Sequence, residues 1–189
     1  MFTSHLEQEA SWVPVKRKLS EIEEQEARRV FASSLDYNKT LIVEGAAWPD
    51  TVARIGSRLS SSPPPSHNAI TLGNRAYFPI QLQTDLPFEE PAFLSDMSWL
   101  VHELTHVWQY QHSGPVYLLQ ALWAQIKLGG NAYAYGWEQG LKQAALDGKN
   151  LLDFNREQQG DIARHYYYRL RQGLDTSAWE PFVLQFQML

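Results

Sequence analysis

The pattern His-Glu-x-x-His occurs in this chain at His102, Glu103 and His106. On a helix, residues four apart leave the same face one turn apart, so both imidazoles can reach a single metal ion. Glu103 then lies beside the pair, where a carboxylate can accept a proton from a water molecule instead of binding the metal. Because this geometry needs unbroken helical turns, the spacing predicts a helix that carries a metal site.

The residues around the motif predict where this helix begins and ends. Ser95 is a favourable N-cap, and Asp96 adds a negative charge to the first turn. Gly114 followed by Pro115 stops a helix. We therefore expect a helix of about seventeen residues that includes both histidines.

The three polar side chains could instead be core residues of an amphipathic helix, packed among neighbours such as Trp99 and Trp108. Two histidines and a glutamate suit a buried stripe poorly, because burying their polar groups costs free energy. The chain has no cysteine, so a transition-metal site must use His, Asp or Glu. Zinc (Zn2+) is the metal that these ligand types predict.

His112 stands six residues after His106, where the metzincin pattern His-Glu-x-x-His-x-x-Gly-x-x-His has its third ligand. That pattern needs its glycine to break the helix, and Gln109 occupies the position here. On a continuous helix, His112 lies about 9 Å along the axis from His106 and on another face. We expect His112 in the last helical turn, where a cation complements the helix dipole.

A segment far down the chain offers a better third ligand. A helix is predicted from about Asn155 to Gln172, and Glu157 and Asp161 stand four residues apart on it. Glu157 can complete a His2Glu site that leaves a fourth position for water. Asp161 can accept a hydrogen bond from the outer nitrogen of a ligand histidine and fix its tautomer.

Other assignments stay open for these residues. Glu157 and Asp161 could form an ordinary charged helix face with Arg164. Glu138 and His165 are the remaining alternatives for the third ligand. The need of the two histidines for a third ligand favours Glu157.

The remaining patterns predict a mostly helical α+β protein, with a loose arm over residues 1–19 and one domain over residues 20–189. In the arm, Lys16 to Lys18 are expected to form a solvated charge cluster. The other expected elements are a helix at 21–34 that begins with a capping box of Ser20 and Glu23, a strand at 39–45, a surface loop at 57–68, a strand or tight hairpin at 69–80 with a bend at Gly73-Asn74, and helices at 116–128, 137–146 and 155–172.

Composition narrows the class of protein. A hydrophobic fraction of 44% in 189 residues suits one domain with its own core. The formal charge is −5 and no basic stripe is present, which argues against nucleic acid as a partner. The N-terminal residues lack the apolar core of a signal peptide, and no run approaches the roughly 20 apolar residues of a membrane span. We expect synthesis in the cytoplasm and, if the protein is exported, a route without a cleavable signal.

With these residues in view, the sequence resembles the gluzincins, in which a later helix carries Glu-x-x-x-Asp. It is more closely similar to the metallopeptidase domains of bacterial polymorphic toxins and of type VI secretion spike proteins. The resemblance covers about residues 28 to 168. The matching stretches are RRVFASSLDYNKTLIVEG, AITLGNRAYFP, HELTHVWQYQ, NAYAYGW and NREQQGDIARHYYY.

The resemblance implies a zincin-like zinc endopeptidase with a short sheet beside the motif helix. Zinc would be held by His102, His106 and Glu157, with Glu103 as the general base. The stretch AITLGNRAYFP would be an edge strand that pairs with an extended peptide. The candidates for the oxyanion donor are Tyr133, Tyr135, His165 and Tyr168, of which we favour Tyr135.

The resemblance also implies an antibacterial effector that acts on envelope proteins in the periplasm of a target cell. Its partners would be a protein or peptide substrate, a secretion spike and an immunity protein. Two other functions are a catalytically silent zinc-binding module of a secretion apparatus and a hydrolase of peptidoglycan cross-links. The intact Glu103 argues against the silent module, because a structural site has no use for a base.

Overall fold

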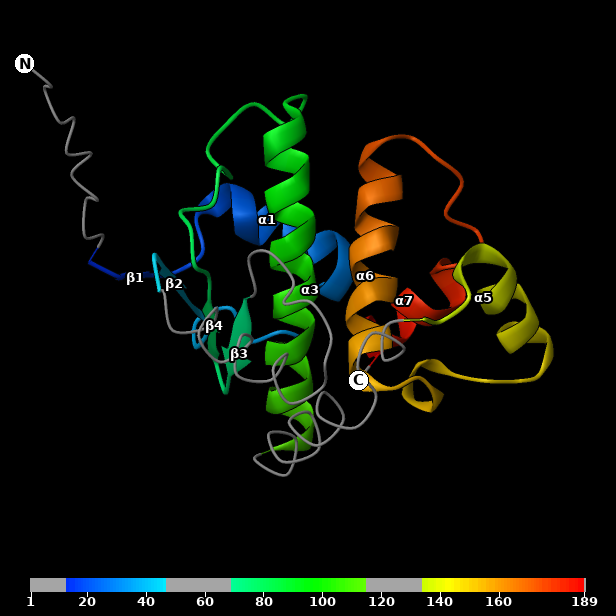
Figure 1. Cartoon of the computed structure of the whole chain (residues 1–189). Helices are drawn as coiled ribbons and strands as arrows, with labels where there is room; N and C mark the ends of the chain where they lie inside the picture. The colour runs from blue at the N-terminus through cyan, green and yellow to red at the C-terminus, as the bar shows by residue number, and fades with distance from the viewer. Residues whose placement is uncertain (1–12, 47–68, 115–133, 189) are drawn as a thin grey trace, which may run out of the picture.

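The computed structural model describes residues 13–46, 69–114 and 134–188 (Figure 1). Its elements are β1 (Val15–Arg17), α1 (Glu21–Phe31), β2 (Leu41–Glu44), β3 (Ile70–Leu72), β4 (Arg75–Tyr77), α3 (Pro91–Ser113), α5 (Trp137–Leu146), the 3-10 turn η2 (Leu151–Asp153), α6 (Arg156–Arg171) and α7 (Glu180–Met188). The predicted α+β class is confirmed. The expected loop at 57–68 and helix at 116–128 lie outside the described residues.

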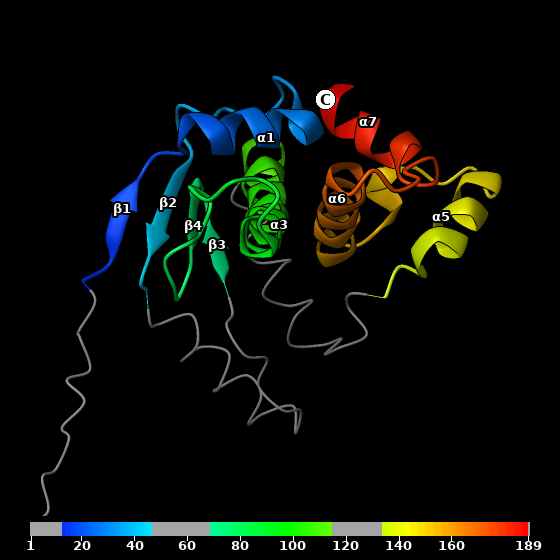
Figure 2. The same cartoon turned by 90° about the horizontal axis from the view of Figure 1, so that it is seen from above.

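Helix α3 lies at the centre of the molecule, between the small sheet and α6 (Figures 1 and 2). Helix α5 lies beyond α6, on the side away from α3 (Figure 2). Helices α1 and α7 contact each other and cover one side of the α3–α6 pair (Figure 2). Among the described helices, none combines the length and apolar character needed to cross a membrane.

The sheet has the strand order β1-β2-β4-β3. Strands β2 and β4 are parallel, whereas β1 pairs with β2 and β3 pairs with β4 in antiparallel fashion. A two-residue turn joins β3 to β4, and Gly73 adopts a φ of 63°, which suits glycine. The hairpin alternative for residues 69–80 is therefore confirmed, and among the described strands β3 is at the edge of the sheet, where it contacts α3.

Helix α3 is longer than its sequence signals predict. Its N-cap is Glu90 and Pro91 is its first residue, so the prediction that Ser95 is the N-cap is wrong. Proline suits this position because its fixed φ is helical and its missing N–H would be unpaired there anyway. The predicted end is confirmed, since the helix stops at Ser113 and Gly114 follows with a φ of 70°.

The N-terminal segment corrects the prediction of a loose arm. Val15–Arg17 form strand β1, so that prediction is wrong for these residues, while residues 1–12 lie outside the described part. The Arg17 guanidinium bonds Glu23 of α1 at 2.6 and 2.8 Å and Glu44 of β2 at 2.6 Å. Both carboxylates are buried, so Arg17 is a connector between elements and not part of a solvated charge cluster.

The remaining helices agree with the sequence signals except at the C-terminus. The capping box of Ser20 and Glu23 is confirmed, and α1 ends at Phe31 instead of residue 34. Helix α5 has the predicted limits, and α6 begins and ends within one residue of the predicted range, with Asn155 as its N-cap. Helix α7 was not predicted; its Phe186 packs edge-on against Phe31 of α1 and Trp108 of α3.

Candidate metal centre

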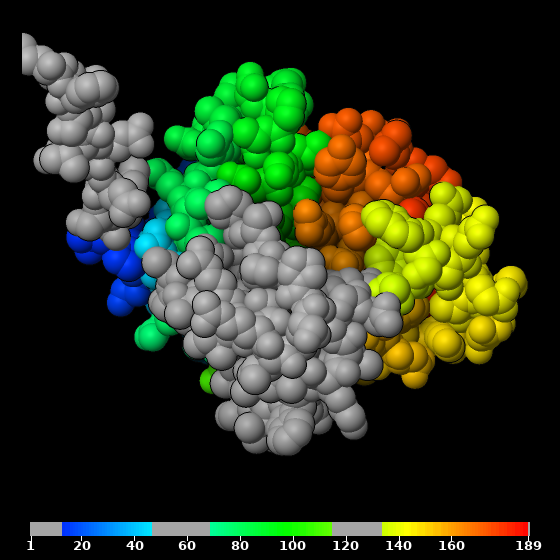
Figure 3. All heavy atoms as spheres, in the orientation of Figure 1, coloured from blue at the N-terminus to red at the C-terminus, as the bar shows by residue number. Residues whose placement is uncertain are grey.

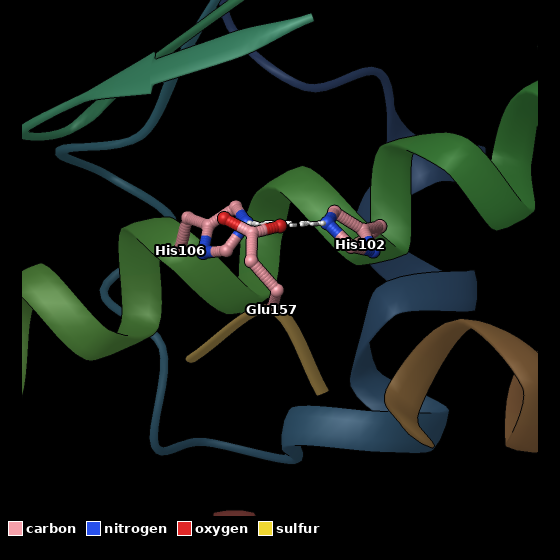
Figure 4. Close-up of side chains that lie close together, drawn as sticks. All are labelled: His102, His106 and Glu157. Carbon is pink, nitrogen blue, oxygen red and sulfur yellow. Dashed lines mark hydrogen bonds and ion pairs between the residues drawn. The ribbon is translucent and has the colours of Figure 1, made fainter. Parts of the chain in front are cut away.

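Two antiparallel helices bring three buried side chains together: His102 and His106 of α3, and Glu157 of α6 (Figures 1 and 4). The two Nε2 atoms lie 3.2 Å apart. Glu157 Oε2 lies 3.4 Å from His102 Nε2 and 3.6 Å from His106 Nε2. These atoms could hold one metal ion, and the helical spacing of the histidines is the reason that both rings point the same way (Figure 4).

Gly160 allows α6 to approach α3 this closely. A Cβ atom at this position would lie 2.8 to 3.0 Å from three atoms of the His102 ring. Glycine in a helix interior costs about 1 kcal/mol relative to alanine, so a helical glycine needs a compensating reason. Here the reason is the space that it leaves for the ring of His102.

The His102 ring is oriented by Asp161, one turn beyond Glu157 on α6. Asp161 Oδ1 lies 3.1 Å from His102 Nδ1, and a carboxylate can only accept, so Nδ1 carries the proton and Nε2 faces the cluster. Burial alone would lower the pKa of His102, but its bonds to Asp161 and Glu157 outweigh burial and raise the pKa to about 10. The predicted contact between Asp161 and a cluster histidine is present.

The His106 ring is oriented by two glutamine amides. Gln109 Nε2 donates to Gln159 Oε1 at 2.8 Å and to the Arg156 carbonyl at 3.1 Å. Gln159 Nε2 in turn donates to the Phe154 carbonyl at 2.8 Å. The Gln109 amide oxygen must therefore face His106 Nδ1, which lies 3.0 Å away. His106 then carries its proton on Nδ1 and presents Nε2 to the cluster.

Glu157 supplies the negative charge of the cluster. Its burial alone would raise its pKa, but the two histidines outweigh that effect and lower the pKa well below its usual range. The carboxylate is therefore ionised at neutral pH. When a cation displaces the protons on Nε2 and Nδ1 stays protonated on both rings, two nitrogen lone pairs and one carboxylate converge on one point, which is an arrangement that binds a cation.

Glu103 points to the sheet side of α3. Its Oε2 accepts a hydrogen bond of 2.7 Å from the hydroxyl of Thr71, the central residue of edge strand β3. Both residues are buried. The base candidate is therefore adjacent to the cluster in sequence and is fixed by a strand on the opposite side of the helix from α6.

The other third-ligand alternatives do not join the cluster. His112 is exposed, stacks on Trp108 at 4.4 Å and lies 2.8 Å from the Trp108 carbonyl. Glu138 forms an exposed pair with Lys142 on α5. His165 lies on α6 and contacts the Tyr135 hydroxyl at 2.9 Å. The expected position of His112 in the last turn of the helix is confirmed.

The favoured oxyanion donor, Tyr135, is buried, and its hydroxyl contacts His165 and Trp179. Trp179 Nε1 donates to its oxygen at 3.1 Å, which leaves the phenolic proton for Nδ1 of His165. Burial is the main cause that lowers the pKa of His165 to about 4, so its ring is neutral and carries its proton on Nε2. Tyr168 is exposed, and Tyr133 lies outside the described residues.

Sequence reasoning missed four residues that shape this site: Thr71, Gln109, Gln159 and Gly160. Of these, Gly160 could have been noticed in the sequence. Glycine is unfavourable inside a helix, and this one stands four residues after the start of the helix, beside Asp161. The other three are ordinary residues of a strand or helix. Their roles depend on which segments meet in space, which spacing along the chain does not show.

The sequence is similar to one segment of a larger bacterial protein. Over 170 residues, it is 33% identical to the type VI secretion system spike protein VgrG2b of Pseudomonas aeruginosa. The matched region is 88% of this chain but 14% of the spike protein. No protein-family model and no solved structure matches the chain. The comparison thus relates most of this chain to a segment of a type VI secretion spike protein.

Proposed function

We propose that this chain is a zinc-dependent endopeptidase. The observation that carries the proposal is the convergence of His102, His106 and Glu157, with Glu103 directly after the first histidine. Two imidazoles and one carboxylate are the protein ligands of one class of catalytic zinc site, which leaves a position open for water. A structural zinc site would use four protein ligands and would not need a neighbouring base.

Each residue of the site has a separate task in this reaction. Zinc, when bound by the three ligands, supplies a Lewis acid for water and for the scissile carbonyl. Glu103 accepts the proton of the attacking water and passes it to the leaving amine. Asp161 and Gln109 hold the two imidazoles in the tautomer that presents Nε2.

The oxyanion donor that we propose is His165, held in place by the hydroxyl of Tyr135. Trp179 donates to the Tyr135 oxygen, so the phenolic proton is directed to His165. The donor that remains on this pair is Nε2–H of His165, one turn beyond Asp161 on α6. A neutral imidazole with a fixed tautomer is a suitable donor to a developing negative charge.

The substrate is a polypeptide in extended conformation. Strand β3 is the edge of the sheet and lies against α3, the helix of the two histidines. An extended peptide can add to such an edge by main-chain hydrogen bonds, which brings its carbonyls past the metal helix. This mode predicts cleavage of unfolded or flexible segments instead of helical ones.

Glu103→Gln tests the reaction. We expect peptide cleavage by the zinc-loaded protein to fall by about 10²–10⁴-fold, the usual effect of removing a general base. Zinc content should stay at one ion per chain, because Glu103 is not a ligand. The control is Glu138→Gln, which makes the same change on the exposed face of α5 and should leave cleavage intact. Unchanged cleavage by Glu103→Gln would reject the proposal.

Metal analysis tests the ligand set. We expect Glu157→Ala to lose zinc during dialysis, because two imidazoles alone hold the ion weakly. His112→Ala should retain zinc, since His112 is exposed and stacks on Trp108. Loss of zinc from the His112 variant alone would overturn the assignment of the third ligand.

The similarity to a spike protein supports a role in type VI secretion. We propose that the chain is delivered with a secretion spike as an antibacterial effector that acts in the periplasm of the target cell. Periplasm-directed expression should then inhibit bacterial growth, and Glu103→Gln should abolish the inhibition. Digestion of isolated peptidoglycan sacculi, with denatured protein left intact, would instead identify a cross-link hydrolase.

A further inference from the structure

We infer that Thr71 is a positioning residue that holds the Glu103 carboxylate and connects it to the edge of the sheet that receives the substrate. The inference rests on the proposed endopeptidase function and specifies how the base is kept in place. Nothing in the His-Glu-x-x-His pattern requires a threonine at this position.

The side chain of Thr71 faces α3. Its Oγ1 lies 2.7 Å from Glu103 Oε2 and 3.2 Å from the Glu103 carbonyl oxygen. A hydroxyl has one proton to donate, and the shorter, charge-assisted contact assigns it to the carboxylate. With Oε2 engaged by Thr71, Oε1 is the oxygen that can accept the proton of water.

The hydrogen bonds of β4 show which way the main chain of β3 faces. The N–H of Leu41 donates to the Asn74 carbonyl, and the N–H of Phe78 donates to the Val43 carbonyl. Main-chain groups of residues two apart in a strand point to the same side. Residues 74, 76 and 78 therefore face β2, and the peptide groups of Arg75 and Tyr77 face β3.

It follows that Thr71 does not exchange main-chain hydrogen bonds with its partner. Thr71 is paired with Ala76, whose peptide groups face β2. The hydrogen-bonded pairs of the hairpin are the neighbouring ones, which contain Ile70 and Leu72. The N–H and carbonyl of Thr71 therefore point away from β4, to an edge on which no strand pairs within the described residues.

Thr71 thus has two groups that can bind different partners, its side-chain hydroxyl and its main chain. Its hydroxyl binds the base, and its main chain offers one donor and one acceptor to an extended peptide. A peptide that pairs with β3 is aligned against the same residue that sets the position of Glu103. A single rigid strand therefore fixes the distance between the substrate backbone and the base.

Thr71→Val removes the hydroxyl and keeps the shape and the strand preference of the side chain. We expect kcat for peptide cleavage to fall by about 10–100-fold, because a hydrogen bond to a charged group is lost. KM should change by less than about threefold, because the main chain of residue 71 is intact. Zinc content should equal that of the wild type, because Thr71 touches no ligand.

Thr71→Ser is the matched control, because it keeps the hydroxyl and removes only a methyl group. We expect its kcat to lie within about threefold of the wild type. If both variants lose kcat equally, keeping the hydroxyl does not preserve activity, and the inference is wrong. An increase in KM without a change in kcat would also overturn it, because Thr71 would then act on substrate binding alone.

Two double variants separate this inference from the proposed function. In a Glu103→Gln background, Thr71→Val should cause no further loss of kcat. In metal-free protein, the effects of Thr71→Val and Glu103→Gln on the urea midpoint should not be additive, because they remove one shared contact. An active Glu103→Gln protein would reject the peptidase itself. An inactive Glu103→Gln with a fully active Thr71→Val would reject only the role of Thr71.

Discussion

The two histidines of the cluster are held by groups of different charge. His102 donates to the carboxylate of Asp161, whereas His106 donates to the neutral amide of Gln109. A carboxylate partner raises the basicity of a ligand imidazole more than an amide does. Both rings therefore present Nε2 to the cluster, but we expect the imidazole of His102 to be the more basic of the two.

Replacing Gln109 tests the amide that orients His106. We expect Gln109→Leu to weaken zinc binding by about 10–100-fold, because His106 loses its acceptor and its fixed tautomer. Gln109→Glu keeps an acceptor for His106 and should bind zinc at least as well as the wild type. Competition with a chromophoric chelator measures both affinities. Equal loss in the two variants would mean that Gln109 only ties α3 to α6.

Gly160→Ala tests the space beside His102. We expect zinc affinity to fall by about tenfold or more, because the new Cβ would displace the ligand ring that lies 2.8 Å away. Gly173→Ala is the control, at a position with a φ of 65° and no atom within 4 Å of the new Cβ. It should cost about 1–2 kcal/mol of stability through backbone strain and leave zinc affinity unchanged.

The local part of the site was readable from sequence because His102, Glu103 and His106 lie within five consecutive residues on one helix. Glu157 could be chosen only by its chemistry and by elimination of His112. Thr71 and Gln159 could not be chosen, because their partners lie on other elements. The sequence distance between partners is what separates the predicted residues from the missed ones.

At the level of elements, α7 packs against α3, the helix of the two histidines, on the side that it covers together with α1 (Figure 2). Phe186 lies 4.9 Å from Trp108 of α3 and 5.5 Å from Phe31 of α1, measured between ring centroids. Sequence analysis missed α7 because exposed Leu184 and Met188 are mixed with buried Phe182, Val183 and Phe186. Apolar residues on both sides of a helix give no clear amphipathic stripe.

Phe186→Ala tests this support. We expect the free energy of unfolding to fall by about 3–5 kcal/mol, the usual cost of a large cavity in a core. Leu184→Ala on the same helix is the control; its side chain is 48% exposed, and the change should cost less than about 1 kcal/mol. Urea unfolding of the two metal-free proteins gives both values. Equal losses would show that α7 contributes helix content instead of this contact.

Strand β1 shows why some elements could not be predicted from the sequence. Three residues are too few for a visible alternation, and their pairing partner β2 is distant in sequence. The hairpin of β3 and β4 was predictable because both strands and the turn are contiguous. Figure 3 shows the resulting molecule with α3, α6 and α5 side by side on one face of the described surface.

At the scale of the whole molecule, Arg17 joins β1, β2 and α1 through two buried carboxylates. One of these, Glu23, also accepts a hydrogen bond from Thr84, which precedes α3. Burial alone would raise the pKa of Glu23, but the Arg17 and Thr84 bonds outweigh it and lower the pKa. The network therefore holds the sheet against α1 most strongly when Glu23 is ionised.

This network predicts a dependence of stability on pH. The folded-state pKa of Glu23 lies below its unfolded value of about 4.3. Its contribution is therefore complete above about pH 4.3 and is lost as the pH falls through the lowered folded-state pKa. Arg17→Met should reduce the free energy of unfolding at pH 7 by about 3 kcal/mol, because it leaves buried carboxylates unpaired.

The difference in free energy of unfolding between Arg17→Met and the wild type should become smaller at about pH 3. At that pH the wild type is losing the stabilisation that ionised Glu23 provides. The control is Lys16→Met, at the exposed neighbouring residue of β1, which should change stability by less than about 0.5 kcal/mol at either pH. Urea unfolding at pH 7 and pH 3 provides the measurement. If the loss of free energy of unfolding in Arg17→Met is the same at both pH values, the stabilisation does not depend on ionised Glu23.

The three residues that could bind a metal ion come from two helices that are well separated along a chain without cysteine. A metal ion bound there would link two distant segments, as a disulfide does in secreted domains, and its binding free energy would stabilise the fold because the unfolded chain rarely contains a formed site. Unlike a disulfide, this cross-link would be independent of redox conditions. The same ion would then stabilise the fold reversibly, and the size of this stabilisation would depend on the concentration of free metal around the protein.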